Sequence, residues 1–445
     1  MNRSTFLSLL LILPTALFAQ DVWTLKSCID YGLKNNHSNQ VYANEKKLAD
    51  AKAREALAAY LPTVTLTGTL DDNLKVQQTV IPAGVFGPED VRVAFTKQYQ
   101  VNPMAQLDQT IFDKSLITGL QANRYSKLQA ELNVAKNEET LIYNICNAYF
   151  QIAVYREQLE LLHSTNETYR GQMQVTEQQV NKGVTLLKDL EKIKVNYNTS
   201  LTQIRVAETN LTLSENQLKF EMGFPILEQL TVKPITNETL DFYIPTTDSL
   251  QQASVSNRTD YKLLQVNAKL TEIDERRLKN IIYPKLSAYA RYGNVGFGNE
   301  VNQAWSSMSS YSSIGLKLTI PIVDFKRQAQ ITQAKYKWRN SIENFKLEES
   351  RYQVELENTR SKFKQEQSNL RLYTENIELA QSTFNAIHLQ YQKGTTDLTE
   401  WLTAQNTLRD SQSNYLNSLY NFFLAKVDLE KAQGTLKDFY QTLSN

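Results

Sequence analysis

The chain has 445 residues, and its 48 basic and 47 acidic side chains leave a formal net charge of +1 at pH 7. That balance provides no basic field for a nucleic acid, so none is expected as a partner. The low mean hydropathy and the 23 tyrosines argue against a helical membrane protein.

The N-terminus has the pattern of a secretory signal peptide. Arg3 precedes an apolar run from Phe6 to Leu13, and small residues follow as far as Ala19. We therefore expect residues 1–19 to be removed on export. No later run approaches 18 consecutive apolar residues, so no transmembrane helix is expected. If the mature chain enters a membrane, it must do so as a β-barrel, because only helices and closed barrels satisfy the backbone in lipid.

The first part of the mature chain reads as helix, strand, loop, strand and very long helix. We expect these at about 34–60, 62–72, 73–97, 98–112 and 113–181. In the first strand, Val64, Leu66 and Leu70 alternate with threonines. Period two is typical of a half-buried strand, or of a barrel wall with lipid outside and water inside.

The second part repeats this order. We expect a helix at about 255–282, strands at about 284–293 and 311–322, and a long helix at 325–392. Four apolar residues of the last strand alternate with polar ones and would form its lipid-facing side: Ile314, Leu316, Leu318 and Ile320. A soluble sheet packed on helices would show the same alternation.

A Lys-Gly break follows each long helix, and a helix of about 37 residues follows each break. Five residues of one break return 211 positions later, as the pairs Lys182/Lys393, Gly183/Gly394, Thr185/Thr396, Leu187/Leu398 and Asp189/Glu400. Landmarks upstream, such as Pro62 and Pro284, are 222 apart, so the first half carries 11 extra residues. The mature chain therefore consists of two copies of one structural repeat, at 20–235 and 236–445.

The long helices carry heptads. Residues 322–393 contain no Gly and no Pro, and the apolar positions from Leu141 to Leu162 step by four and three, which indicates coiled-coil packing. A helix of about 69 residues is roughly 100 Å long. Four strands per chain are too few to close a barrel, since barrels begin at about eight strands, so an open tube needs three or more chains.

With these features, the chain resembles the TolC-type outer-membrane efflux proteins, also called outer membrane factors. The resemblance rests on the doubled order, on the segment LKNNHSNQVYANEKKLADAKAREALAAYLPTVTL, and on the tips NKGVTLLKDL and QKGTTDLTEWL. It implies a mainly α fold in which a homotrimer forms a 12-stranded β-barrel in outer-membrane lipid, continuous with a 12-helix α-barrel in the periplasm. It also implies docking to a periplasmic adaptor (membrane fusion) protein and an inner-membrane transporter.

The two tips are then the turns at the periplasmic mouth. Gly183 and Gly394 suit the left-handed conformation that ends a helix, and we expect Thr185 and Thr396 to cap the next helix. The resemblance implies that the adaptor docks on the tip turns, which comprise Lys182, Gly183, Thr185, Lys393, Gly394 and Thr396. It also implies that Asp189 and Glu400 line the narrowest aperture, although acids also simply favour a helix start. Thr403 stands where relatives have a second acid.

Other functions fit less well. A soluble exported coiled-coil scaffold leaves the strands unexplained, and a periplasmic adaptor has a single helical hairpin. An outer-membrane channel for type I protein secretion stays open as an alternative to efflux. No catalytic constellation, metal spacing or cofactor motif is present, so neither an enzyme nor a cofactor is expected. Cys28 and Cys146 form no framework, and His37, His163 and His388 are interpreted as helix-surface residues.

Overall fold

The computed structural model describes residues 22–85, 87–234 and 254–443. The expected signal peptide and the junction between the repeats at 235/236 lie outside these residues. The chain forms two compact units. The helical unit contains 22–41, 135–234, 254–261 and 349–443, and the sheet unit contains 42–134 and 262–348. Each long helix contributes residues to both units.

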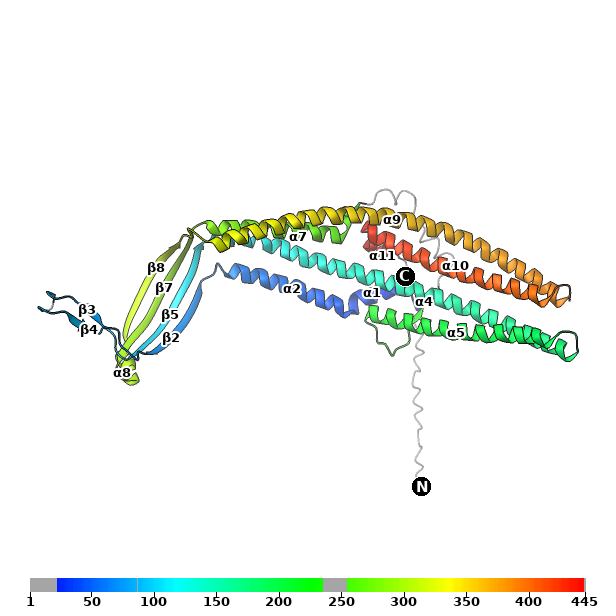
Figure 1. The fold of residues 1–445 in the computed structure, drawn as a ribbon, viewed down its shortest axis with the longest axis horizontal. Coiled ribbons are helices and arrows are strands. Elements are labelled where there is room, and N and C mark those ends of the chain that lie inside the picture. Colours follow the sequence, from blue (N-terminus) through cyan, green and yellow to red (C-terminus); the bar gives the residue numbers. More distant parts are fainter. Residues whose placement is uncertain (1–21, 86, 235–253, 444–445) are drawn as a thin grey trace, which may run out of the picture. The chain divides into compact units, whose positions relative to one another are not determined.

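The sheet unit is built on one antiparallel sheet of four strands (Figure 1), in the order β2-β5-β7-β8. The strands are β2 (Thr63–Asp72), β5 (Tyr99–Phe112), β7 (Lys285–Gly298) and β8 (Ser309–Thr319). The expected end of the last strand was wrong. Strand β8 ends at Thr319, so Ile320 lies beyond it, because Pro321 has no N–H to donate to a ladder.

The expected loop at 73–97 and the segment between the expected strands 284–293 and 311–322 contain further elements. The first holds a separate two-stranded pair, β3 (Thr79–Ile81) and β4 (Val91–Val93). The second holds the end of β7 and the short helix α8 (Val301–Ser306). Helix α8 lies directly on β7, because a Cβ added at Gly296 would come within 1.8 Å of the Ala304 carbonyl oxygen. Glycine is required there by this close approach of two backbones.

The first expected helix is two helices, α1 (Leu25–Asn35) and α2 (His37–Ala58). Asn36 interrupts them in an extended conformation with ψ at 128°. Its side chain accepts a hydrogen bond from the Ser38 N–H at 2.8 Å and donates one to the Glu221 carbonyl at 2.7 Å. An asparagine that bonds local backbone competes with helix continuation, which accounts for the break.

The first long helix also begins with a separate piece, α3 (Lys114–Leu120), before α4 (Ala122–Asn181). The Asp113 carboxylate caps α3 by accepting from the Ser115 and Leu116 N–H groups. Its counterpart α9 (Phe325–Gln392) is unbroken. The remaining elements are α5 (Leu187–Met222), α7 (Thr259–Lys279), α10 (Leu398–Gln433), α11 (Leu436–Thr442), the 3-10 turns η1 (Val255–Asn257) and η2 (Asn280–Ile282), and the parallel pair β1 (Val22–Trp23) and β6 (Thr231–Val232).

The heptad prediction is confirmed in the helical unit. Leu141, Ile145, Ala148 and Ile152 are each at most 4% exposed. Ile145, Ala148 and Ile152 belong to a core in which the rings of Phe150 on α4 and Phe423 on α10 stack with centroids 4.3 Å apart. The same core buries Cys28 and Cys146, which are free thiols whose pKa values burial raises. Packing at these positions, rather than helix propensity, stabilises such long helices.

The duplication reappears in the backbone. Gly183, Gly223, Gly394 and Gly434 all have positive φ, between 67° and 73°. Each ends a helix with two hydrogen bonds, one spanning five residues and one spanning three, which is the Schellman arrangement. A Cβ at Gly223 would meet the Asn35 carbonyl, and a Cβ at Gly434 would meet the Arg258 N–H nitrogen. The same junction is therefore built once in each repeat.

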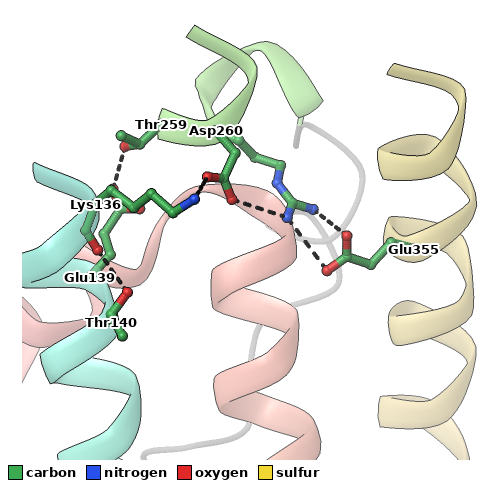
Figure 2. A network of polar contacts seen from close by, with 7 residues as sticks. Lys136, Glu139, Thr140, Thr259, Asp260 and Glu355 are labelled. Carbon is green, nitrogen blue, oxygen red and sulfur yellow. Dashed lines mark hydrogen bonds and ion pairs between the residues drawn. The ribbon is translucent and has the colours of Figure 1, made fainter. Parts of the chain in front are cut away.

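A polar network fixes the start of α7 in the helical unit (Figure 2). Arg258, 5% exposed, donates to the Glu355 carboxylate of α9 at 2.9 Å and lies over the Tyr352 ring. Lys136 of α4 pairs with Asp260 at 2.7 Å. Removing one partner would leave a buried charge uncompensated, so the network specifies where α7 begins.

Candidate functional site

The four-stranded sheet has one apolar face. Ile314, Leu316 and Leu318 of β8 lie on it and are 86%, 69% and 60% exposed. They stand opposite Ala290, Ala288 and Leu286 of β7. Ile320, expected on the same face, is 54% exposed but follows the strand.

The apolar face continues across the other two strands. Val64 and Leu66 of β2 are 71% and 82% exposed, opposite Leu107 and Ala105 of β5. An apolar surface of this extent marks a site that contacts another protein or a membrane. Among the described residues, no helix is long and apolar enough to cross a membrane.

The opposite face of the sheet is polar. Thr63, Thr65, Thr67 and Thr69 line β2 on this side, and the register places Asp108, Arg291 and Lys317 on the same side of the other strands. Two tyrosines lie across glycines of the neighbouring strand, Tyr289 over Gly315 and Tyr311 over Gly293. The alternation of the sequence is thus realised as two chemically distinct faces.

The first tip turn joins α4 to α5. Gly183 ends α4 with φ at 72°, and α5 begins after Leu186 without any side-chain cap. The expectation that Thr185 caps this helix was wrong. Its hydroxyl donates instead to the Asp189 carboxylate at 3.3 Å, because Thr185 lies two residues before the helix rather than at its N-cap.

The second tip turn joins α9 to α10, and Gly394 ends α9 with φ at 71°. Here Asp397 is the N-cap, and its carboxylate accepts from the Glu400 N–H at 2.8 Å. The expectation for Thr396 was wrong for the same reason as for Thr185: its hydroxyl contacts the Glu400 carboxylate.

The structure brings each expected aperture acid to the threonine of its own turn. Asp189 is also 3.7 Å from the Lys192 ammonium. Glu400 is exposed and lines a groove between α9 and α10 together with Thr403. Among the described residues, no hydrogen bond or ion pair joins Asp189 to Glu400. Lys182, Gly183, Lys393 and Gly394 are all exposed at the tips.

Sequence reasoning missed a cluster behind the second tip. The indole N–H of Trp401, which is 0% exposed, donates to Nδ1 of His388 at 2.8 Å. His388 also stacks on Phe384, so its interpretation as a simple helix-surface residue was wrong. Burial lowers the pKa of His388. Continuing the heptad from α9 through the turn into α10 could have indicated that these residues meet.

Among the residues that the structure describes, no group of three or more His, Cys, Asp and Glu side chains could hold a metal ion. The candidate functional features are the two-faced sheet of the sheet unit and the two tip turns of the helical unit.

The chain is similar to known proteins both in sequence and in fold. Residues 29–223 and 264–435 match the family model described as "Outer membrane efflux protein". The chain is 25% identical to the outer membrane protein TolC of Salmonella enteritidis over 346 residues, which is 75% of this chain and 69% of that protein. TolC of Escherichia coli (strain K12) is equally similar, over 349 residues, with the same coverage.

Solved structures share the fold. The outer membrane protein VceC of Vibrio cholerae superposes with a TM-score of 0.74 and 15% identity, covering 92% of this chain and 96% of that one. The outer-membrane channel OprN superposes with a TM-score of 0.76 and 16% identity, covering 92% of this chain and 90% of that one.

Proposed function

The chain belongs to the outer membrane efflux protein family, and we propose that three copies of it form one duct from the periplasm through the outer membrane. Membership makes it an outer-membrane efflux channel that extends into the periplasm. We propose how the three copies assemble, which face of each sheet points to lipid, where the gate lies and which partners dock on the channel.

The observation that carries the proposal is the two-faced sheet. Burying a Leu or Ile side chain away from water is worth about 1.5–3 kcal/mol, so a row such as Ile314, Leu316 and Leu318 favours an apolar surrounding. The polar face carries Asp108, Arg291 and Lys317, which need water. Lipid outside and a water-filled pore inside satisfy both faces.

The sheet also has two edges, β2 and β8, whose outer backbone groups have no partner strand among the described residues. Unpaired backbone groups cannot remain in lipid. If β8 of one copy pairs with β2 of the next, three copies close a sheet of twelve strands. This closure makes the homotrimer the smallest assembly with an open interior.

The test compares two neighbouring residues of β8. Leu318→Arg places a charge on the proposed lipid face, where a charge costs up to about 2–4 kcal/mol per chain at the bilayer midplane and less toward the interfaces. Lys317→Arg keeps the charge on the proposed pore face and serves as the matched control. We expect Leu318→Arg to reduce trimer in outer-membrane fractions strongly and Lys317→Arg to leave it unchanged. Equal effects at both positions would refute the assignment of faces.

We further propose that Asp189 and Glu400 of three copies converge at the periplasmic mouth. A ring of carboxylates attracts cations and repels anions. Asp189→Asn with Glu400→Gln should therefore reduce cation selectivity in planar-bilayer recordings while the trimer still assembles. Unchanged selectivity in an assembled double variant would leave both residues as acids at a helix start, where each is worth about 0.3–1 kcal/mol.

The tip turns are proposed to dock a periplasmic adaptor, which links the channel to an inner-membrane transporter. Their exposed lysines, Lys182 and Lys393, offer a charge to a partner. Lys182→Glu with Lys393→Glu should abolish cross-linking of the trimer to an adaptor. A matched pair of charge reversals in the segment between β2 and β5, at Lys75 and Arg92, should not. Retained cross-linking in the tip variant would exclude these lysines from the contact.

A further inference from the structure

Arg291 lies near the middle of β7, on the polar face of the sheet. The register places it opposite Gln106 of β5 and Ser313 of β8. Its side chain is exposed, and its guanidinium carbon lies 4.6 Å from the centre of the Tyr289 ring. A guanidinium over an aromatic face is held by attraction to the ring quadrupole.

The ring that holds Arg291 is itself fixed. Tyr289 stands directly opposite Gly315, and a Cβ at that position would come 2.5 Å from the Tyr289 hydroxyl oxygen. The phenol therefore occupies the space that a side chain at position 315 would fill, and a larger residue there would displace it. Gly315, Tyr289 and Arg291 form a stack that holds the guanidinium in one place, and this limits the conformational entropy that it would lose on binding.

The charge of Arg291 is not neutralised within the chain. Among the described residues, no carboxylate lies within ion-pair distance of it. The nearest acid by register, Asp108, occupies the next row, where both of its oxygens accept from the Gln106 amide at 2.9 and 2.8 Å. Lys285, at the first residue of β7, pairs within the chain with Asp113, and the Lys285 ammonium lies 3.4 Å from the Asp113 carboxylate.

We propose that Arg291 is an anion site on the wall of the pore. It rests on the proposed function, because the polar face must line the pore. A guanidinium binds two oxygens of one anion in parallel, so the matching solutes carry carboxylate, phosphate or sulfonate groups. Asp189 and Glu400 attract cations at the mouth, whereas Arg291 attracts anions at the sheet.

The test is the reversal potential of full-length trimers in a planar bilayer under a potassium chloride gradient. The potential of three charges about 10 Å from the pore axis acts on the two ions in opposite directions, so Arg291→Gln should lower the chloride-to-potassium permeability ratio about fivefold at ~0.1 M salt and about twentyfold at ~0.01 M. At about 1 M salt the difference should vanish, because the Debye length is then about 3 Å.

The matched control removes a charge elsewhere. Arg92→Gln deletes an exposed arginine of β4, outside the four-stranded sheet, and should leave the ratio unchanged. An equal shift in both variants would overturn the proposal, because it would report net charge rather than a site. An unchanged ratio in Arg291→Gln would overturn it directly.

Two further variants separate charge from position. Arg291→Lys keeps the charge and should retain the permeability ratio, but it should weaken block by added inorganic pyrophosphate, because an ammonium lacks the bidentate fork. Tyr289→Leu leaves the arginine unsupported and should weaken the same block. Full block in both variants would overturn the stacked geometry. Wild-type trimers that conduct no ions would overturn the proposed function itself, and this inference with it.

Discussion

The two tip turns of the helical unit show what a repeated sequence does and does not repeat. Both contain Lys-Gly, both glycines have φ near 70°, and both end their helix with the same two backbone hydrogen bonds. The helices that follow begin differently. Asp397 caps α10, whereas Leu186 occupies the same place before α5 and offers no side-chain acceptor.

The packing behind the tips differs as well. Trp401 fills the interior behind the second tip, and Leu190 stands 211 residues earlier behind the first. His388, which accepts the Trp401 N–H, corresponds to Glu177. The turn is therefore encoded locally and survives in both copies, while the side chains that support it have diverged. The second tip is the more firmly fixed of the two.

The largest expected effect concerns the packing behind the two tips. Trp401→Ala should lower the free energy of unfolding by about 3–5 kcal/mol, because it vacates a fully buried aromatic side chain. Leu190→Ala removes fewer atoms, and we expect a loss of about 2 kcal/mol. Thermal unfolding of the purified protein measures both. A loss at Leu190 as large as at Trp401 would show that the tips are equally supported.

The glycines should behave alike in both tips. Gly183→Ala and Gly394→Ala force a side chain into the left-handed region and should each cost about 1–2 kcal/mol. Gly171, inside α4 with open space around it, is the control. Gly171→Ala should raise stability by about 1 kcal/mol, because alanine is the better helix former. Markedly different unfolding midpoints of the two tip variants would contradict this prediction.

The caps offer a way to make the tips more alike. Asp397→Ala should cost about 1 kcal/mol, because it leaves the Glu400 N–H without its acceptor. Leu186 is 60% exposed and has nearly the same backbone conformation as Asp397. Leu186→Asp should therefore stabilise α5 by up to about 1 kcal/mol. No gain in the unfolding midpoint would mean that the α5 N-terminus is already satisfied in the assembled protein.

The smallest effect concerns pH. Burial lowers the pKa of His388 in the folded protein below its unfolded value, so the unfolded chain binds the proton more readily. The stabilisation from the neutral imidazole is present above about pH 6.5 and falls as pH drops from there through the folded pKa. His388→Gln keeps an acceptor for the Trp401 N–H. It should flatten the pH dependence of the unfolding midpoint between pH 7.5 and 5. An unchanged pH dependence in this variant would show that other titratable groups cause it.

Local and periodic features could be predicted from the sequence. The Lys-Gly turns, the alternation of β2 and β8 and the heptads of α4 and α9 each depend on residues a few positions apart. The duplication supports these predictions, because each pattern occurs in both copies of the repeated unit. The proposed sites at the tips and on the strands follow from these patterns as positions along the chain.

The tertiary structure decided what those positions contact. The break at Asn36 depends on Glu221, the position of the partly buried His388 depends on Trp401 across the turn, and the position of Arg291 depends on Gly315 of another strand. Each of these partners is distant in sequence or on another element. Their contacts arise because folding selects the arrangement that satisfies buried polar groups and fills space across the whole chain. Periodicity reports which face of an element is apolar, but not which residue it meets.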